Sequence, residues 1–228
     1  MTSKLKYVKY KMVQENPKIQ GLSIVLIGDF NPKIFQPAWF GMEGLIARKD
    51  VEDAEIQIVH PDIVKFNLKW LSFNVTRERL IVETAQEPYY EVMRDLVLGT
   101  FKILRHTPIK MMGINHTRHF LMDSEEEWHK FGDKLAPKEC WKRILKKPGM
   151  RSLTIEDIRP DSFKGYIRVT VAPSVKTHPG VFFQVNDHFE TKDPENTIGT
   201  DEIISILEHV WDDSSKRGKE IIKTILLE

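Results

Sequence analysis

The sequence has one cysteine, no surplus of charge of either sign and no long apolar run. Cys140 has no second cysteine to pair with, which excludes an internal disulfide and a cysteine-based structural zinc site. No segment approaches the ~18 consecutive apolar residues of a membrane-spanning helix, and the first residues contain no apolar signal core. We therefore expect a cytoplasmic protein with no membrane partner.

The charge balance disfavours nucleic acid as a partner. The chain has 34 Lys and Arg residues against 33 Asp and Glu residues, so its formal net charge is +1. Non-specific binding to nucleic acid depends on surplus cations that neutralise phosphates, and only a local patch could supply them here. Two basic stretches stand out, the lysines before residue 20, interleaved with Tyr7 and Tyr10, and residues 142–147. We interpret them as a solvated arm and a helix end.

The common catalytic and cofactor motifs are also missing. The chain contains no Gly-x-Gly-x-x-Gly, no Gly-Lys-Ser/Thr phosphate loop and no Gly-x-Ser-x-Gly elbow. Cys140 stands beside Trp141 in a probable helical segment, where a lone cysteine is usually a small packing residue. The sequence thus predicts no cofactor and indicates no catalytic residue.

With 228 residues, 41% of them hydrophobic, the chain is long enough to bury a substantial core as one large or two small domains. Strands are predicted where β-branched or alternating apolar residues run between turn signals. Helices are predicted where apolar residues recur at helical spacing. The expected strands cover 22–27, 55–60, 64–75 with a β-bulge after Trp70, 79–84, 109–122, 151–158, 166–172 and 180–189. The expected helices cover 37–47, 88–105, 124–135 with a continuation at 141–145, and a long segment capped by Thr200.

This order reads β-α-β-β-β-α twice and predicts an α+β fold. We expect a tandem duplication with an antiparallel-rich sheet, or two sheets, and helices on one side. The expected organisation is a basic N-terminal arm at 1–20, a first half at 21–106 and a second half at 107–228, with the two halves either separate or joined in one continuous domain. Function is expected on the open side of the sheet.

The strand at 109–122 carries several polar residues that a partner could contact. Side chains alternate along a strand, which places Asn115, Thr117 and His119 on one face and His116, Arg118 and Phe120 on the other. Two histidines three residues apart do not share a strand face, so a metal pair is disfavoured. The candidate partner-binding residues are Asn115, His116, Arg118 and His119, with the aromatic pairs Trp39-Phe40 and Phe182-Phe183.

A second cluster surrounds Asp187 and His188, with Glu190 close by in the sequence. Carboxylate and imidazole groups that converge are the ligands of a divalent metal in a hydrolase. Glu156 and Asp157 could join them from a neighbouring strand. A polar turn leaving a sheet has the same composition, so both interpretations stay open.

The first part of the element layout is a strand-rich first half, the helix at 88–105 and the strand at 109–122, which contains Gly113-Ile114. It continues with a strand ending at Asp187, a helix containing His209 and an aliphatic helix end at 221–225. In these features the chain resembles a sporadically distributed family of uncharacterised prokaryotic proteins, often carried on mobile elements. The corresponding strand of that family typically reads Gly-Leu-Arg-Tyr-Ile-Asn-Arg. The resemblance implies a fold and a context in defence or toxin neutralisation, and no catalytic residues.

Three functions follow from these observations. The first is a non-catalytic protein that binds another protein, or itself, through an open sheet face, sheet edges or aromatic groups. The second is a metal-dependent hydrolase or nuclease that uses Asp187, His188 and Glu190. The third is a duplicated, saddle-like sheet that grips nucleic acid, which the charge balance disfavours.

Overall fold

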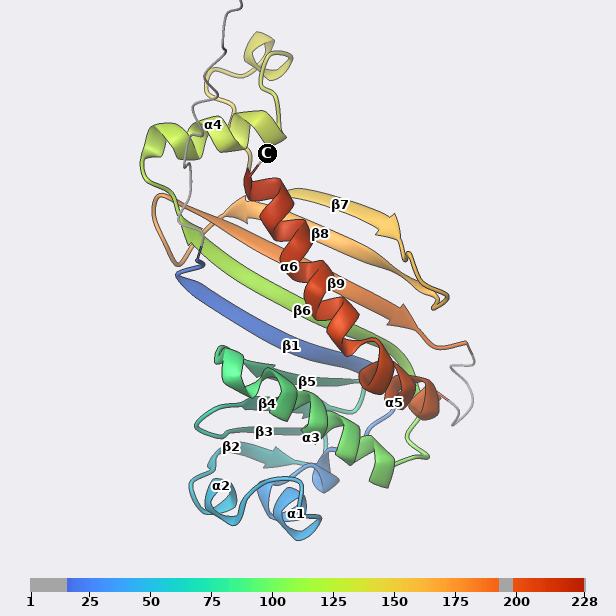
Figure 1. Cartoon of the computed structure of the whole chain (residues 1–228). Helices are drawn as coiled ribbons and strands as arrows, with labels where there is room; N and C mark the ends of the chain where they lie inside the picture. The colour runs from blue at the N-terminus through green and yellow to red at the C-terminus, as the bar shows by residue number, and fades with distance from the viewer. Residues whose placement is uncertain (1–15, 193–198, 228) are drawn as a thin grey trace, which may run out of the picture.

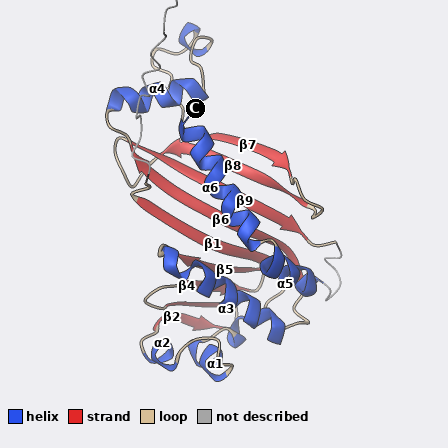
Figure 2. Cartoon of the chain, viewed as in Figure 1, coloured by secondary structure: helices blue, strands red, loops and turns tan. Residues whose placement is uncertain are grey.

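Strands form the central layer of the protein, and several of them bury every second side chain (Figures 1 and 2). The computed structural model describes residues 16–192 and 199–227. The strands are β1 (Ile19–Gly28), β2 (Glu55–His60), β3 (Ile63–Asn67), β4 (Ser72–Thr76), β5 (Arg79–Thr84), β6 (Ile109–Leu121), β7 (Leu153–Ile158), β8 (Gly165–Pro173) and β9 (Gly180–Glu190). The predicted bounds of β2 and β5 are confirmed, and the other predicted strands are confirmed with small shifts at their ends, except that the single strand predicted over 64–75 is two strands, β3 and β4.

These strands form one antiparallel sheet in the order β2-β3-β4-β5-β1-β6-β9-β8-β7. The α+β class is confirmed, and both halves of the chain share this sheet. Outward from the central β1–β6 pair, the strands β5, β4 and β3 correspond in order to β9, β8 and β7. β2 has no counterpart beyond β7. The tandem duplication itself stays a prediction.

Helices cover one face of the sheet (Figure 1). They are α1 (Pro37–Met42), α2 (Arg48–Glu52), α3 (Tyr90–Ile103), α4 (Glu125–Leu135), α5 (Gly199–His209) and α6 (Trp211–Leu227), with short 3-10 turns η1 (Pro32–Ile34), η2 (Glu87–Tyr89) and η3 (Trp141–Arg143). Ser124 caps α4 by accepting a hydrogen bond from the Glu127 N–H, as the Ser-x-x-Glu pattern predicts.

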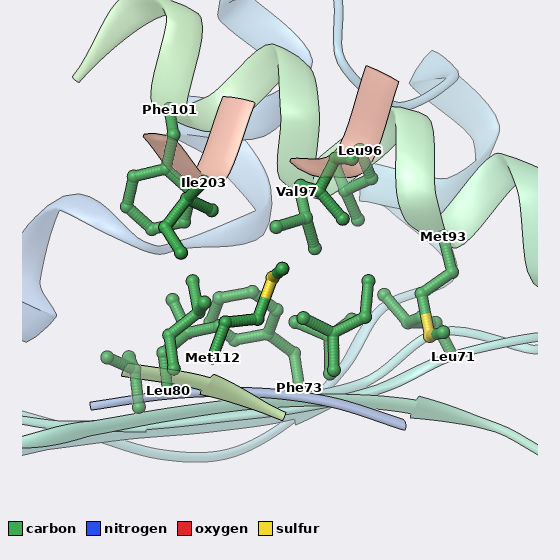
Figure 3. Packing of buried hydrophobic residues seen from close by; sticks show 14 of the residues in the cluster. Leu71, Phe73, Leu80, Met93, Leu96, Val97, Phe101, Met112 and Ile203 are labelled. Atoms are coloured by element: carbon green, nitrogen blue, oxygen red, sulfur yellow. The ribbon is translucent and has the colours of Figure 1, made fainter. Parts of the chain in front are cut away.

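The core lies between this helical layer and the sheet. In Figure 3, α3 directs its apolar side chains onto the strands, and Ile203 of α5 joins them. A second apolar cluster, around Phe183 and Val185 of β9, is covered by α4 and α6. Each fully buried aromatic or aliphatic side chain of this kind contributes roughly 1.5–3 kcal/mol of hydrophobic stabilisation. Figure 3 labels the residues that form the contact between α3 and the layer beneath it. On α3 they are Met93, Leu96, Val97 and Phe101, and opposite them lie Leu71, Phe73, Leu80 and Met112.

The β-bulge predicted after Trp70 is wrong. The chain instead makes a tight turn there, in which the backbone N–H groups of Leu68 and Leu71 each donate to the other residue's carbonyl oxygen. β3 and β4 are therefore two antiparallel strands and not one bulged strand. The shift in apolar phase arises because the turn reverses the chain before the alternation resumes.

The helix predictions need three corrections. The helix predicted over 37–47 ends early, because α1 covers only Pro37–Met42 and a separate short helix, α2, begins at Arg48, beyond the predicted segment. The continuation predicted at 141–145 is only the 3-10 turn η3. The long C-terminal helix is divided at Val210 into α5 and α6. Thr200 does not cap it, because its hydroxyl lies within the first turn of α5 and donates to the Thr107 carbonyl oxygen.

Helix α6 packs closely on the sheet at Gly218. A Cβ atom at this position would lie 2.8 Å from Cδ2 and 3.0 Å from Cγ of His116 on β6. His116 is itself only 4% exposed, so its ring has little room to move away. The small residues Ser214 and Gly218, both buried, therefore mark close packing and not a break in the helix.

We predict that Gly218→Val destabilises the protein. The added side chain would overlap the His116 ring, and overpacking of this kind costs about 1–3 kcal/mol. Urea unfolding should show this loss, whereas Glu220→Val, at an exposed position on the same helix, should change the free energy of unfolding by less than about 0.5–1 kcal/mol. Equal effects of the two variants would contradict the close-packing interpretation.

Candidate functional site

The sheet face opposite the helices carries the candidate site, and we call it the open face. None of the helices in the described part of the chain covers it, and its side chains follow from the strand pairing. Most of these side chains are small, amide or hydroxyl groups. Near the centre of the face they are Gly21, Ser23, Val25 and Ile27 on β1; Ser72 and Asn74 on β4; Ile81 and Glu83 on β5; Gly113, Asn115, Thr117 and His119 on β6; Tyr166, Arg168 and Thr170 on β8; and Phe182, Gln184, Asn186 and His188 on β9. Charged residues lie nearer its margins, among them Lys65, Arg79, Glu156 and Glu190.

Three amides form a hydrogen-bonded group at the centre of this face, the amide cluster. Asn115 Oδ1 accepts hydrogen bonds from Asn186 Nδ2 at 2.5 Å and from Gln184 Nε2 at 3.3 Å. Asn115 and Asn186 are direct partners in the β6–β9 register. A Cβ atom at Gly113 would lie 3.1 Å from Asn186 Nδ2, so the glycine leaves room for the cluster. These contacts hold the amides in fixed positions.

Ring contacts lie on both sides of the amide cluster. His188 stacks on Tyr166 with 4.3 Å between ring centroids, and the Arg168 guanidinium lies 4.6 Å from the same Tyr166 ring. Further along β9, Phe182 lies 4.9 Å from His119. The open face thus combines hydrogen-bonded amides with the half-buried rings of Tyr166, Phe182 and His188, whereas the His119 ring is buried.

Both histidines of the open face are neutral at pH 7. Burial, followed by the nearby Lys176, lowers the pKa of His119, and burial is also the main cause of the lowered pKa of His188. The Nδ1 atom of His119 is 2.8 Å from the Ser174 hydroxyl oxygen, which fixes the ring in the plane of that contact. The histidines therefore add no positive charge to this surface.

Two adjoining cavities open on this face near the start of β1 and β9. One has a volume of about 730 Å³ and the other about 590 Å³. Glu83, Thr117, His119 and Lys176 line both, so the cavities form a continuous hollow across β5, β1 and β6. Its wall combines charges of both signs with the Phe182 ring. A hollow of this size accommodates side chains or a loop of a partner.

The structure separates Asp187 from His188. Strand alternation directs His188 to the open face and Asp187 to the helix-covered face, where its side chain is 1% exposed. Glu190 pairs instead with Lys164, with 2.6 Å between Nζ and Oε2. Among residues 16–192 and 199–227, no group of three or more His, Cys, Asp or Glu side chains is placed to hold a metal ion. The three residues proposed as metal ligands thus do not converge.

Asp187 belongs to a buried ion network, which we call the arginine–aspartate network. Arg159 Nη1 donates to Asp187 Oδ1, and Arg217 Nη1 of α6 donates to Oδ2 at 2.8 Å. Arg159 also binds Asp161 and lies over the Phe189 ring, 3.6 Å from its centroid. The network joins β9 to the loop after β7 and to α6. A carboxylate with two arginine partners has a structural role here and no free oxygen lone pairs aimed at solvent.

The alternation predicted along β6 is confirmed, and it divides the candidate partner-binding residues. Asn115 and His119 lie on the open face, whereas His116 and Arg118 face the helical layer. His116 is buried against α6, so it is not available to a partner in this structure. The prediction of a partner-binding role for His116 is therefore replaced by a packing role.

The aromatic candidates are divided in a similar way. Phe40 is fully buried and packs on Phe66 and Phe73, and Trp39 is partly buried against the same core. Phe183 is also fully buried, whereas Phe182 lies on the open face. Of these four rings, Phe182 alone belongs to the candidate site, and Phe40 and Trp39 serve the core.

Several open-face residues were missed by the sequence reasoning. Gln184 and Asn186 stand at alternating positions with Phe182 and His188, in a strand that was predicted, so the period of two could have placed them together. Tyr166 and Ser174 gave no such signal, because their contacts with His188 and His119 depend on pairing between strands. The lysine-rich residues 4–11 lie outside the described residues.

Comparison with models of known protein families and with curated proteins finds no match for this chain. Among the described residues, none of the helices is long and apolar enough to cross a membrane.

We predict that Asp187→Ala strongly destabilises the protein. Removal of the carboxylate leaves Arg159, with a side chain 1% exposed, without its buried partner, and breaking such a pair costs about 3–5 kcal/mol. Urea unfolding measures this loss. As a control, Glu156→Ala removes an exposed ion pair with Arg168 and should cost no more than about 1 kcal/mol. A loss below 1 kcal/mol for Asp187→Ala would refute the structural role of the network.

We also predict a stability loss in mild acid caused by His116. Burial, with nearby Arg118 and Lys219, lowers the pKa of His116 to about 4, whereas the unfolded chain titrates near 6.5. Between these values only the unfolded chain binds the proton, so stability falls as the pH drops from 6.5 to 4, by about 3 kcal/mol in total. The contribution is fully present above pH 6.5.

The measurement is urea unfolding at several pH values with His116→Leu beside the unchanged protein. The variant should lose about 3 kcal/mol less between pH 6.5 and 4. His209→Gln, at an exposed position, serves as the control and should keep the original slope. Parallel profiles for His116→Leu and the unchanged protein would contradict the prediction.

Proposed function

We propose that this protein is a non-catalytic binding protein that holds a protein partner on the open face of its sheet. The observation that carries this proposal is the amide cluster of Asn115, Gln184 and Asn186, which is preorganised on a sheet face without a helical cover. Gln184 and Asn186 are half-buried, so their amides can meet the backbone of a partner, and the buried Asn115, 6% exposed, holds them in place. Groups held in this way bind at a low cost in conformational entropy.

The composition of the face supports a protein partner. Protein-binding surfaces often combine tyrosine and other flat rings, which give contact area at little entropic cost, with asparagine, serine and glycine, which provide adaptable hydrogen bonds. Tyr166, His188 and Phe182 supply the rings here, and the amide cluster supplies the hydrogen bonds. The hollow beside His119 gives a projecting side chain of the partner a place to enter.

The electrostatics of the face support a protein more than a nucleic acid. Arg168 Nη2 lies 2.7 Å from Glu156 Oε2, and Lys164 is paired with Glu190. Cations that already have carboxylate partners release few counterions on contact with phosphates, so they add little affinity for nucleic acid. The neutral histidines of the open face likewise provide no positive charge that would attract phosphates.

The metal-dependent hydrolase is the weaker alternative. A hydrolytic metal site needs several oxygen or imidazole ligands that converge and an open position for water. Asp187 is bound to two arginines on the other side of the sheet from His188, and Glu190 is bound to Lys164. No observation on this cluster favours metal over ion pairing.

The proposal is tested by affinity purification from the native cells, with mass spectrometry of the proteins that come with the chain. Gln184→Arg and Thr170→Arg each place a bulky, charged side chain on the open face, and each should abolish co-purification of the partner. Loss of a well-packed contact at the centre of an interface costs about 2 kcal/mol or more, which weakens binding about 30-fold.

The control is Glu220→Arg, which introduces the same side chain, with a larger change in charge, at an exposed position of α6 on the other side of the protein. It should retain the partner, and thermal unfolding should show that all three variants are folded. Retention of the partner by both open-face variants would disprove the proposed location. Salt-sensitive co-purification of nucleic acid, lost in the same variants, would replace the protein partner with a nucleic acid.

A further inference from the structure

The strand β7 forms one edge of the sheet and pairs only with β8 (Figure 1). Within the described part of the chain, no strand pairs with its outer side. Ile155 is 59% exposed and Ile158 is 81% exposed. An edge strand of this kind presents a row of backbone N–H and C=O groups that another strand can bind.

The opposite edge strand, β2, is less suited to bind a further strand. The register of the β2–β3 pair shifts between Ile56 and Ile58, which marks a bulge or irregularity. Bulges twist an edge and disfavour the addition of a strand. β7 pairs with β8 in an unbroken register from Leu153 to Ile158. Neither edge strand contains lysine or proline, two residues that commonly protect edges, so the irregular register of β2 is what distinguishes the two. Of the two edges, β7 is therefore the one open to a further strand.

The strand order adds a second reason. Counted outward from the central β1–β6 pair, β7 occupies the position that β3 occupies in the other half. β3 is covered on its outer side by β2, whereas the half that ends in β7 has no described strand at that position. The β7 edge thus lacks the neighbour that its counterpart has.

We infer that a second copy of this chain binds here, with its β7 antiparallel to the first, so that the two sheets continue into one another across a two-fold axis. Because directly opposed side chains must lie on the same face of the joined sheet, the axis can pass only through one residue and its own copy. Two such registers pair five residues of one β7 strand with five residues of its copy. One is centred on Ile155 and the other on Glu156.

Charge selects between these two registers. Centred on Glu156, the pairing sets two carboxylates directly opposite each other, which destabilises a strand pair. Centred on Ile155, it sets the exposed Ile155 side chain against its own copy, Thr154 against Glu156 and Leu153 against Asp157. No like charges are opposed in this register, and the Glu156 charge is already balanced by Arg168 of its own chain.

The edge pairing is independent of the partner proposed for the open face. Because the two-fold axis is perpendicular to the sheet, both open faces would lie on the same side of the dimer. Two binding surfaces held side by side bind a multivalent partner with increased avidity. The pairing relies mainly on backbone hydrogen bonds over a short strand, so we expect a dimer that dissociates on dilution.

The first test is the molar mass of the full chain by sedimentation equilibrium over a wide range of protein concentration. The mass should rise from 26.7 kDa toward twice that value. Ile155→Lys opposes two ammonium groups at the axis and should keep the protein monomeric at all concentrations. Ile58→Lys makes the same change on the β2 edge, at a residue 41% exposed, and should leave the dimer unchanged.

The second test fixes the register. In a Cys140→Ser background, Ile155→Cys should form an intermolecular disulfide on mild oxidation, because opposed Cβ atoms of antiparallel strands lie about 4.5–5.5 Å apart, close to the ~3.5–4.5 Å of a disulfide. Ile58→Cys in the same background should not form one. Thermal unfolding checks that every variant is folded.

Several outcomes would overturn the inference. They are a monomer at every concentration, a dimer that survives Ile155→Lys, and a crosslink through Ile58→Cys in place of Ile155→Cys. Loss of a different bound protein in Ile155→Lys, with a monomeric unchanged chain, would assign the β7 edge to another partner and overturn self-association.

Discussion

The strand β6 imposes the constraint on which the rest of the structure depends. It pairs with β1 on one side and with β9 on the other along its length, and so joins the two halves of the chain into one sheet. Its alternate side chains serve two environments, with Ile114 and His116 beneath the helices and Asn115 and His119 on the open face. A slip of one residue in either pairing would exchange these two sets and place amides in the core. The core and the candidate surface are therefore fixed by the same register.

The arginine–aspartate network shows how the helix-covered face of the sheet accommodates a charged side chain. Asp187 is opposite Ile114 of β6 and Ile167 of β8, so its carboxylate enters an apolar layer. A buried charge is tolerated only with partners, and Arg159 and Arg217 supply them from two other elements. Since Arg217 belongs to α6, the network also fixes where that helix lies on the sheet. We attribute to it a role in specifying this arrangement more than in adding net stability.

Local patterns predicted much of this fold. The bounds of β2 and β5, the alternation in β6 and the Ser124 cap of α4 depend on neighbours within a few residues, and those predictions are confirmed. The errors occurred where distant contacts decide. Nothing near residue 70 distinguishes a bulge from the tight turn between β3 and β4, and Val210 gives no local sign that the C-terminal helix ends there.

The candidate site was predicted less well than the fold, for the same reason. Asp187 and His188 are adjacent in the sequence and suggested a shared metal site, but strand alternation directs them to opposite faces. The arginine partners of Asp187 are 28 and 30 residues away in the chain, so no spacing rule connects them. The sequence alternation was enough to place Asn115 on the open face. The contacts of Asn115 with Gln184 and Asn186 could not be predicted in this way, because they depend on the register between β6 and β9.

An uncovered sheet face is common in antiparallel sheets, so exposure alone does not indicate binding. What distinguishes this face is that its central positions hold interlocked amides in place of scattered lysines and glutamates, the usual residues of a merely solvated face. Charges are also almost balanced over the whole chain, at 34 against 33, and the ion pairs beside the amide cluster repeat that balance locally. A surface that is flat, polar and nearly neutral has little long-range attraction for any partner. Recognition there must rest on short-range hydrogen bonds and ring contacts, which depend on shape and are best matched by another folded protein.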